Sequence, residues 1–184
     1  MNKKTIMVDI DGVISAFHQH FIQYLNHATV PSSNYKAMDL DGWKMKGMTE
    51  KEIRYIHEQY ASDGMYLHLP LKLGAYDDLR SLHKKRNILL CTGRDATLVR
   101  DTKVWLRNND LDTYPLMFEK DKVDVCQGKG IEELIDDSID ILIKAKDAGI
   151  KTYAVYGPNN YRTIDQHIPP ITLLNKIGDI HNYI

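Results

Sequence analysis

Cysteine, long apolar runs and net charge are all scarce in this chain of 184 residues. Its two cysteines, Cys91 and Cys126, do not make a disulfide framework, and such usage is typical of a reducing compartment. No apolar run approaches the roughly 20 residues of a membrane span, and the acids of the first strand are incompatible with a secretory signal. A net charge of -1 argues against a general basic field for long nucleic acid. We therefore expect a cytoplasmic protein without a membrane partner.

Apolar strands and amphipathic helices alternate along most of the chain. Residues 4–9 form an early apolar stretch, and the same kind of stretch recurs at 87–92, 116–118, 131–135, 151–156 and 171–174. Between them, helical patterns cover 74–86, 95–109 and 139–148, with shorter ones near 122–126 and 178–184. This alternation predicts an α/β, Rossmann-like fold: a parallel sheet with helices on both faces.

Residues 14–69 differ from the rest, because aromatic and histidine residues are frequent there and β-branched runs are few. Phe17 and Phe21 recur at helical spacing, and Thr49 opens a second helix with a capping-box pattern. We expect a small helical domain over 14–69, inserted into an α/β core made of 1–13 and 70–184. Phe21 and Tyr55 are expected in the core of this insert, and His18 and His20 at its surface or in its packing.

Two acids end the first strand, in the run Asp9-Ile10-Asp11-Gly12-Val13. Alternate strand residues point to the same side, so Asp9 and Asp11 should lie together at the carboxyl end of the strand. Neighbouring carboxylates repel unless a cation or a shared proton compensates, and Asp is disfavoured in strands. The pair therefore indicates a divalent metal beside a reactive carboxylate; a structural calcium site is the alternative.

Other predicted strand ends carry polar groups of the same kind. Thr92-Gly93-Arg94 follows one strand, Lys122 comes soon after the next, and Asp136-Asp137 ends another. The carboxyl ends of parallel strands open on one crevice. Carboxylates suit Mg²⁺, a helix start after Gly93 offers N–H groups to an anion, and lysine adds a positive charge. The set indicates phosphoryl chemistry, although a receiver domain also gathers acids around Mg²⁺ and any single lysine is usually a surface group.

These motifs, in this order, resemble those of the haloacid dehalogenase superfamily of phosphohydrolases. The resemblance implies an aspartyl-phosphate formed on Asp9, with Asp11 as general acid and then general base. Asp9, the Asp11 carbonyl and Asp137 would hold Mg²⁺, with Asp136 in support. The proximity of Asp9 would favour the protonated form of Asp11 unless the metal field dominates.

The same resemblance assigns the other residues to the substrate. Thr92 and the Gly93 N–H would bind phosphoryl oxygens, and Lys122 would bridge the phosphate and Asp9. Arg94 would contact a second phosphate or a sugar, or pair with Asp95. A metal site with a paired Asp136-Asp137 also argues against the dehalogenase branch, whose chemistry needs no Mg²⁺.

The insert would act as a helical cap that selects the leaving group. Phe17 and Trp43 are its candidate pocket residues, since aromatic rings stack on nucleobases. Asp-x-Asp-Gly-Val with a short cap looks like the 5'(3')-deoxyribonucleotidase branch, so the expected substrate is a small phosphate ester, namely a nucleotide. That branch often has Thr-Ser-Pro where this chain has Thr92-Gly93-Arg94, a motif also found in polynucleotide 3'-phosphatases. That activity and a non-catalytic binding role remain alternatives, and a homodimer is left open.

Overall fold

The computed structural model describes residues 3–27, 40–41, 44–45, 49–157, 160 and 171–184. Its main sheet contains β1 (Thr5–Asp9), β4 (Asn87–Thr92), β5 (Leu116–Phe118), β6 (Glu133–Asp136), β7 (Lys151–Val155) and β8 (Thr172–Leu174). The helices are α1 (Phe17–His27), α2 (Glu50–Ser62), α3 (Ala75–Lys85), α4 (Val99–Asn108), α5 (Lys122–Lys129) and α6 (Ile139–Asp147). Short 3-10 turns are η2 (Met65–His68), η3 (Ala96–Leu98) and η4 (Ile177–Asn182), and β2 (Leu40–Asp41) pairs with β3 (Lys44–Met45).

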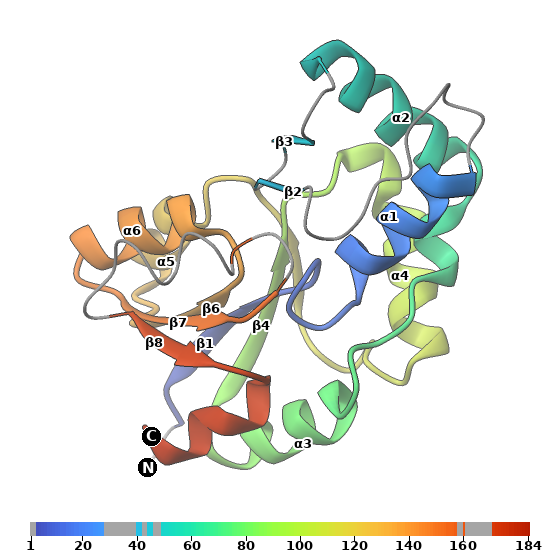
Figure 1. The fold of residues 1–184 in the computed structure, drawn as a ribbon. Helices are drawn as coiled ribbons and strands as arrows, with labels where there is room; N and C mark the ends of the chain where they lie inside the picture. The colour runs from blue at the N-terminus through green and yellow to red at the C-terminus, as the bar shows by residue number, and fades with distance from the viewer. Residues whose placement is uncertain (1–2, 28–39, 42–43, 46–48, 158–159, 161–170) are drawn as a thin grey trace.

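The main sheet has the strand order β5-β4-β1-β6-β7-β8, and every neighbouring pair is parallel. Helices cover both faces, with α5 and α6 on one and α3, α4 and η4 on the other (Figure 1). The predicted α/β, Rossmann-like fold is thus confirmed. The chain turns in opposite directions on either side of β1, and this reversal opens a crevice at the carboxyl ends of the central strands.

The central strand is buried on both faces, as its unbroken apolar sequence requires in a parallel sheet. Ile6 and Val8 face the larger hydrophobic cluster with α3, α4 and η4, whereas Met7 faces the smaller one with α5 and α6. Cys91 is buried as expected; burial raises the pKa of the Cys91 thiol to about 12 and that of Cys126 to about 11. Both cysteines are free thiols.

The segment that carries α1, α2 and η2 leaves and rejoins the α/β core at adjacent points. The Ala16 N–H donates to the carbonyl of Pro70 at 2.9 Å, and the Lys72 N–H donates to that of Ile14 at 2.8 Å. Buried side chains of α1 and α2 continue into the large cluster beside α4. The predicted capping box at Thr49 is present, with Thr49 and Glu52 each accepting from the other's backbone N–H. No helix of the described residues is long and apolar enough to cross a membrane.

Several local expectations need correction. The β2–β3 pair has two residues in each strand, too few for a period-two pattern, and was not expected. The terminal helix expected over 178–184 is the 3-10 turn η4. Tyr55 is 59% exposed rather than part of the core, whereas Phe21 is buried as predicted.

An aromatic cluster between α1 and α2 buries a histidine side chain. The His57 ring stacks on Phe21 at 4.3 Å between centroids, and burial lowers the pKa of His57 to about 4 from 6.5. At high pH the His57 ring is neutral in both the folded and the unfolded protein. As pH falls below 6.5, the unfolded chain takes up a proton on this ring before the folded protein does, which favours unfolding. We expect the free energy of unfolding to fall by up to about 3 kcal/mol as pH drops through this window.

Urea titrations at several pH values, on wild type and on His57→Phe, measure this loss. Phenylalanine preserves ring stacking but cannot take up a proton, so the acid-side slope should flatten in the variant. An unchanged slope would assign the acid sensitivity to other groups.

Candidate active site

The strand ends converge as the sequence predicts. Asp9 ends β1, Thr92 ends the neighbouring β4, and Asp136 ends β6 on the other side. Asp137 follows directly, and Lys122 begins α5 after β5. A cavity of about 180 Å³ lies at this edge and is lined by all five residues together with Asp11 and Gly93.

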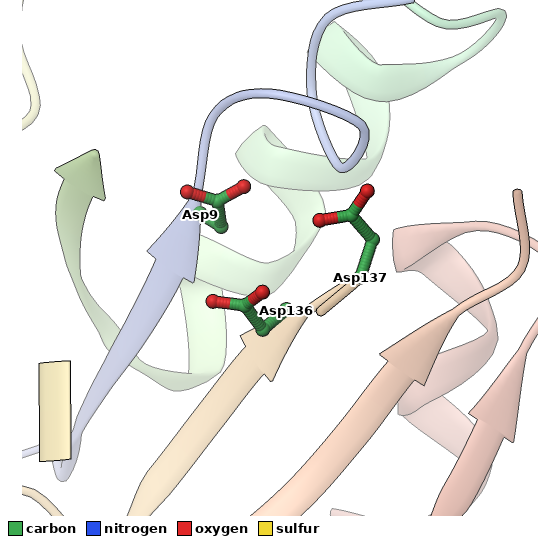
Figure 2. Close-up of side chains that lie close together, drawn as sticks. All are labelled: Asp9, Asp136 and Asp137. Atoms are coloured by element: carbon green, nitrogen blue, oxygen red, sulfur yellow. The ribbon is translucent and has the colours of Figure 1, made fainter. Parts of the chain in front are cut away.

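Three buried carboxylates form the centre of the site. One carboxylate oxygen from each of Asp9, Asp136 and Asp137 lies within 4.8 Å of the others, and Figure 2 shows the three groups turned toward a common space. Burial raises the pKa of Asp9 well above its usual value, Lys122 opposes this rise, and Asp136, Asp137 and Asp11 add to it. The pKa of Asp136 is raised too, first by burial and then by Asp137, although Lys122 and the Ser138 N–H act against the rise. Because like charges this close repel each other, a bound cation would stabilise the ionised forms of these carboxylates.

Lys122 supplies part of that positive charge. Its ammonium donates to Asp9 Oδ1 at 2.5 Å and to Asp136 Oδ2 at 2.6 Å, and the side chain is 4% exposed. Burial alone would lower the pKa of Lys122, but the two carboxylates outweigh it and hold the pKa well above the usual value. One ammonium faces three carboxylates, so the cluster is only partly neutralised when all three acids are ionised. This donor set, oxygen-only and partly neutralised, fits Mg²⁺.

Asp11 lies at the cavity but is held by a different cation. Arg94 donates to its carboxylate from Nε at 2.7 Å and from Nη2 at 2.6 Å, and the Ser15 hydroxyl donates at 3.0 Å. Burial would raise the pKa of Asp11, but the charge and hydrogen bonds of Arg94, with the bond from Ser15, lower it below its usual value. The expectation that proximity to Asp9 favours protonated Asp11 is therefore wrong for this state, because a bidentate guanidinium outweighs a neighbouring carboxylate.

The Arg94 side chain is buried and contacts other protein groups rather than solvent. Its Nη1 donates to the Thr102 hydroxyl at 3.0 Å, and its guanidinium lies 4.7 Å from the Tyr66 ring centroid and 5.5 Å from that of Trp105. Asp95, the partner considered from sequence, instead accepts from the Thr97 N–H at 2.9 Å as the cap of η3. Arg94 thus orients Asp11 and links η2 to α4, and a direct contact with substrate stays a prediction.

Of the two expected aromatic pocket residues, Phe17 is placed differently from the expectation. Phe17 is 1% exposed and packs among Phe21, Tyr60 and Tyr66, with ring centroids 5.5 to 5.8 Å away. It belongs to the hydrophobic core and does not line the cavity, because the first turn of α1 directs it toward α2 and η2. Trp43 lies outside the described residues.

Three residues near the site were not assigned to it from the sequence. His18 lies 2.8 Å from Asp137, Asn160 donates to the Asp137 carbonyl at 2.9 Å, and Lys120 lines the cavity. His18 and Asn160 lie 119 and 23 residues from Asp137, so no local spacing pattern reports their contacts. His18 is a packing residue as expected, but its partner is an acid of the metal-type cluster.

No family model and no curated protein matches this chain, whereas solved structures with the same fold are numerous. A haloacid dehalogenase-like family hydrolase from Streptococcus pneumoniae is similar at 16% identity and a TM-score of 0.71, covering 98% of both chains. A predicted phosphoglycolate phosphatase from Haemophilus somnus has 18% identity and a TM-score of 0.68, covering 98% of this chain and 97% of that one. An L-2-haloacid dehalogenase has 13% identity and a TM-score of 0.64, covering 98% and 99%.

At these identities the comparisons establish the fold, which is that of the haloacid dehalogenase-like hydrolases. Because the same fold occurs in a dehalogenase and in a protein described as a phosphatase, the fold does not select the reaction. The choice between them has to come from the side chains of the site.

Proposed function

We propose that this protein is a Mg²⁺-dependent phosphomonoester hydrolase that works through an aspartyl-phosphate on Asp9. The observation that carries the proposal is the buried cluster of Asp9, Asp136 and Asp137 around Lys122, at a cavity that Thr92 and Gly93 also line. A dehalogenase has no use for three converging carboxylates that require a cation. A phosphatase needs both the cation and the cationic side chain, because its substrate and its nucleophile are anions.

The chemistry follows from the residues around the cavity. The Asp9 carboxylate attacks phosphorus, the bond from phosphorus to the leaving oxygen breaks, and that oxygen takes a proton from the Asp11 carboxyl. In the second step Asp11 removes a proton from water, the water oxygen attacks phosphorus, and the bond to Asp9 breaks. Inorganic phosphate leaves, and Asp9 is again a carboxylate.

Charge compensation comes from several groups. Lys122, Thr92 and Gly93 line the cavity, and in this proposal Lys122, the Thr92 hydroxyl and the Gly93 N–H would receive phosphoryl oxygens. Asp9 and Asp137, supported by Asp136, would hold Mg²⁺. When bound, Mg²⁺ supplies positive charge to the carboxylates and to the phosphoryl group. Arg94 holds Asp11 ionised in the described state, which suits the water-activating step; proton donation to the leaving group requires this ion pair to loosen.

For the leaving group we propose a nucleoside, so that the protein acts on nucleoside or deoxynucleoside monophosphates. The support is the Asp9-x-Asp11-Gly-Val motif and the aromatic content of 14–69, which we propose forms a cap over the site. A small organic acid phosphate is the second candidate, because a solved structure described as a predicted phosphoglycolate phosphatase shares the fold.

Phosphate release from a substrate panel, with and without Mg²⁺, tests the proposal. The panel holds nucleoside and deoxynucleoside monophosphates, phosphoglycolate and a 3'-phosphorylated oligonucleotide. We expect Mg²⁺-dependent release that is fastest from mononucleotides. Preference for phosphoglycolate would replace the nucleotide assignment, and release only from the oligonucleotide would indicate an end-processing phosphatase. No release from any substrate would contradict the proposed activity.

A further inference from the structure

His18 joins the first helix of the inserted segment to the carboxylate cluster of the core. The residue lies in the first turn of α1, its side chain is 4% exposed, and its Nε2 lies 2.8 Å from Asp137 Oδ2. A carboxylate that binds a cation is ionised and only accepts hydrogen bonds, so in the cation-bound site Nε2–H would be the donor. The contact spans 119 residues of sequence and occupies one of the two oxygens of Asp137.

The loop after Asp11 encloses this contact from the other side. A Cβ atom on Gly12 would lie 1.9 Å from Asp137 Oδ2 and 2.8 Å from His18 Nε2, so the backbone of Gly12 passes directly against the pair. Gly12 also has a φ of +85°, a conformation that residues with a side chain rarely adopt. Both features favour glycine at this position. The close approach of the Gly12 backbone also leaves little space around the Asp137 carboxylate.

The backbone of Asp137 is fixed independently. Asn160 is 1% exposed and donates from Nδ2 to the carbonyls of Asp137 and Val155, both at 2.9 Å, while its Oδ1 accepts from the Gly157 N–H at 2.9 Å. Asn160 therefore holds the peptide that carries Asp137 against the end of β7. Within this arrangement, His18 contacts the carboxylate itself.

We propose that His18 is a positioning residue for the cation: it holds Asp137 Oδ2 so that the other carboxylate oxygen faces Asp9 and Asp136. This inference rests on the proposed function, which makes the cluster a metal site. Carboxylates that bind metals are themselves held by hydrogen bonds, and loss of such a partner typically weakens metal affinity about 10- to 100-fold. Lys122 holds Asp9 and Asp136 in the same way, so each acid of the cluster has a built-in partner.

The test is the affinity of the full chain for Mn²⁺, measured by titration calorimetry without substrate. Mn²⁺ occupies the same oxygen sites as Mg²⁺. We expect His18→Leu to raise the Kd for Mn²⁺ by about tenfold or more. His18→Gln, whose amide can still donate, should recover most of the affinity. His20→Leu is the matched control, because His20 lies on the same helix but contacts the Tyr60 hydroxyl at 2.7 Å; its Kd should stay within about twofold of wild type. Circular dichroism and Tm report whether each variant is folded.

Equal or tighter Mn²⁺ binding by folded His18→Leu would overturn the inference while leaving the metal site intact. A similar loss in His20→Leu would also overturn it, since the effect would then belong to the helix as a whole. If His18→Leu does not fold, His18→Gln provides the test. A rise in its Kd for Mn²⁺ as large as that expected for His18→Leu would refute the donor role of His18. Wild-type protein that binds no Mn²⁺ would contradict the proposed metal site itself, and the inference with it.

Discussion

Asp9→Asn should reduce phosphate release by roughly 10⁴-fold or more, the scale expected when a nucleophile is removed. The amide is almost the same size as the carboxylate but cannot attack phosphorus to form the acyl phosphate. The fold should persist, because burial and three neighbouring carboxylates already disfavour the charge on Asp9. Phosphate release and urea unfolding, measured on the same samples, separate the two effects.

Asp140→Asn provides the matched control for this variant. Asp140 is an exposed acid in the first turn of α6, close in sequence to Asp136 and Asp137. The same change of acid to amide at this position should leave turnover within about twofold of wild type. Wild-type-like turnover in Asp9→Asn would contradict the covalent mechanism.

Lys122→Met should have the largest effect on stability among the site variants. Removal of the ammonium leaves Asp9 and Asp136 buried without their shared partner, and breaking a buried ion pair on one side typically costs about 3–5 kcal/mol. We expect Mg²⁺ to restore part of this loss, because a bound cation compensates the same carboxylates. The free energy of unfolding in urea, with and without Mg²⁺, measures both effects.

The pH dependence of this variant has a definite sign. An acid whose folded-state pKa is raised above its unfolded value stabilises the fold most at low pH, and this contribution is lost as pH rises through the folded value. The pKa of Asp9 is already raised in wild type, and loss of Lys122 raises it further. The deficit of Lys122→Met should therefore be smaller near about pH 5 than near about pH 8.

Lys129→Met is the matched control for Lys122→Met. Lys129 is an exposed lysine at the other end of α5, so its replacement should change stability by less than about 0.5 kcal/mol. A Lys122→Met protein as stable as this control, at every pH and without Mg²⁺, would show that the carboxylates do not need the lysine.

The arrangement of strands and helices was predictable because it follows from local patterns. Apolar stretches that end in Asp9, Thr92 and Asp136 read as buried parallel strands, and parallel strands bring their carboxyl ends to one edge of a sheet. Lys122 was identifiable by its place soon after the apolar strand at 116–118. Conversely, β2 and β3 have two residues each, so no periodic pattern could reveal them.

The aromatic residue Phe17 of α1 shows what the sequence pattern alone could not predict. Sequence spacing placed Phe17 on a helix but could not tell whether its ring turns toward a substrate or toward other rings. In the structure Phe17 contacts Phe21, Tyr60 and Tyr66 in one core. Side-chain direction depends on how α1 packs on α2 and η2, and packing is a property of the assembled elements.

The sequence by itself determined the α/β fold and the set of acids and Lys122 at the strand ends, since strand periodicity and topology are sufficient for both. Tertiary structure alone decided the partners of those acids. Arg94 pairs with Asp11 and lowers its pKa, rather than pairing with Asp95, and His18 contacts Asp137 across 119 residues. The reason is physical: the pKa of a buried carboxylate depends on charges and donors within a few ångströms, and folding brings these together from distant positions in the chain.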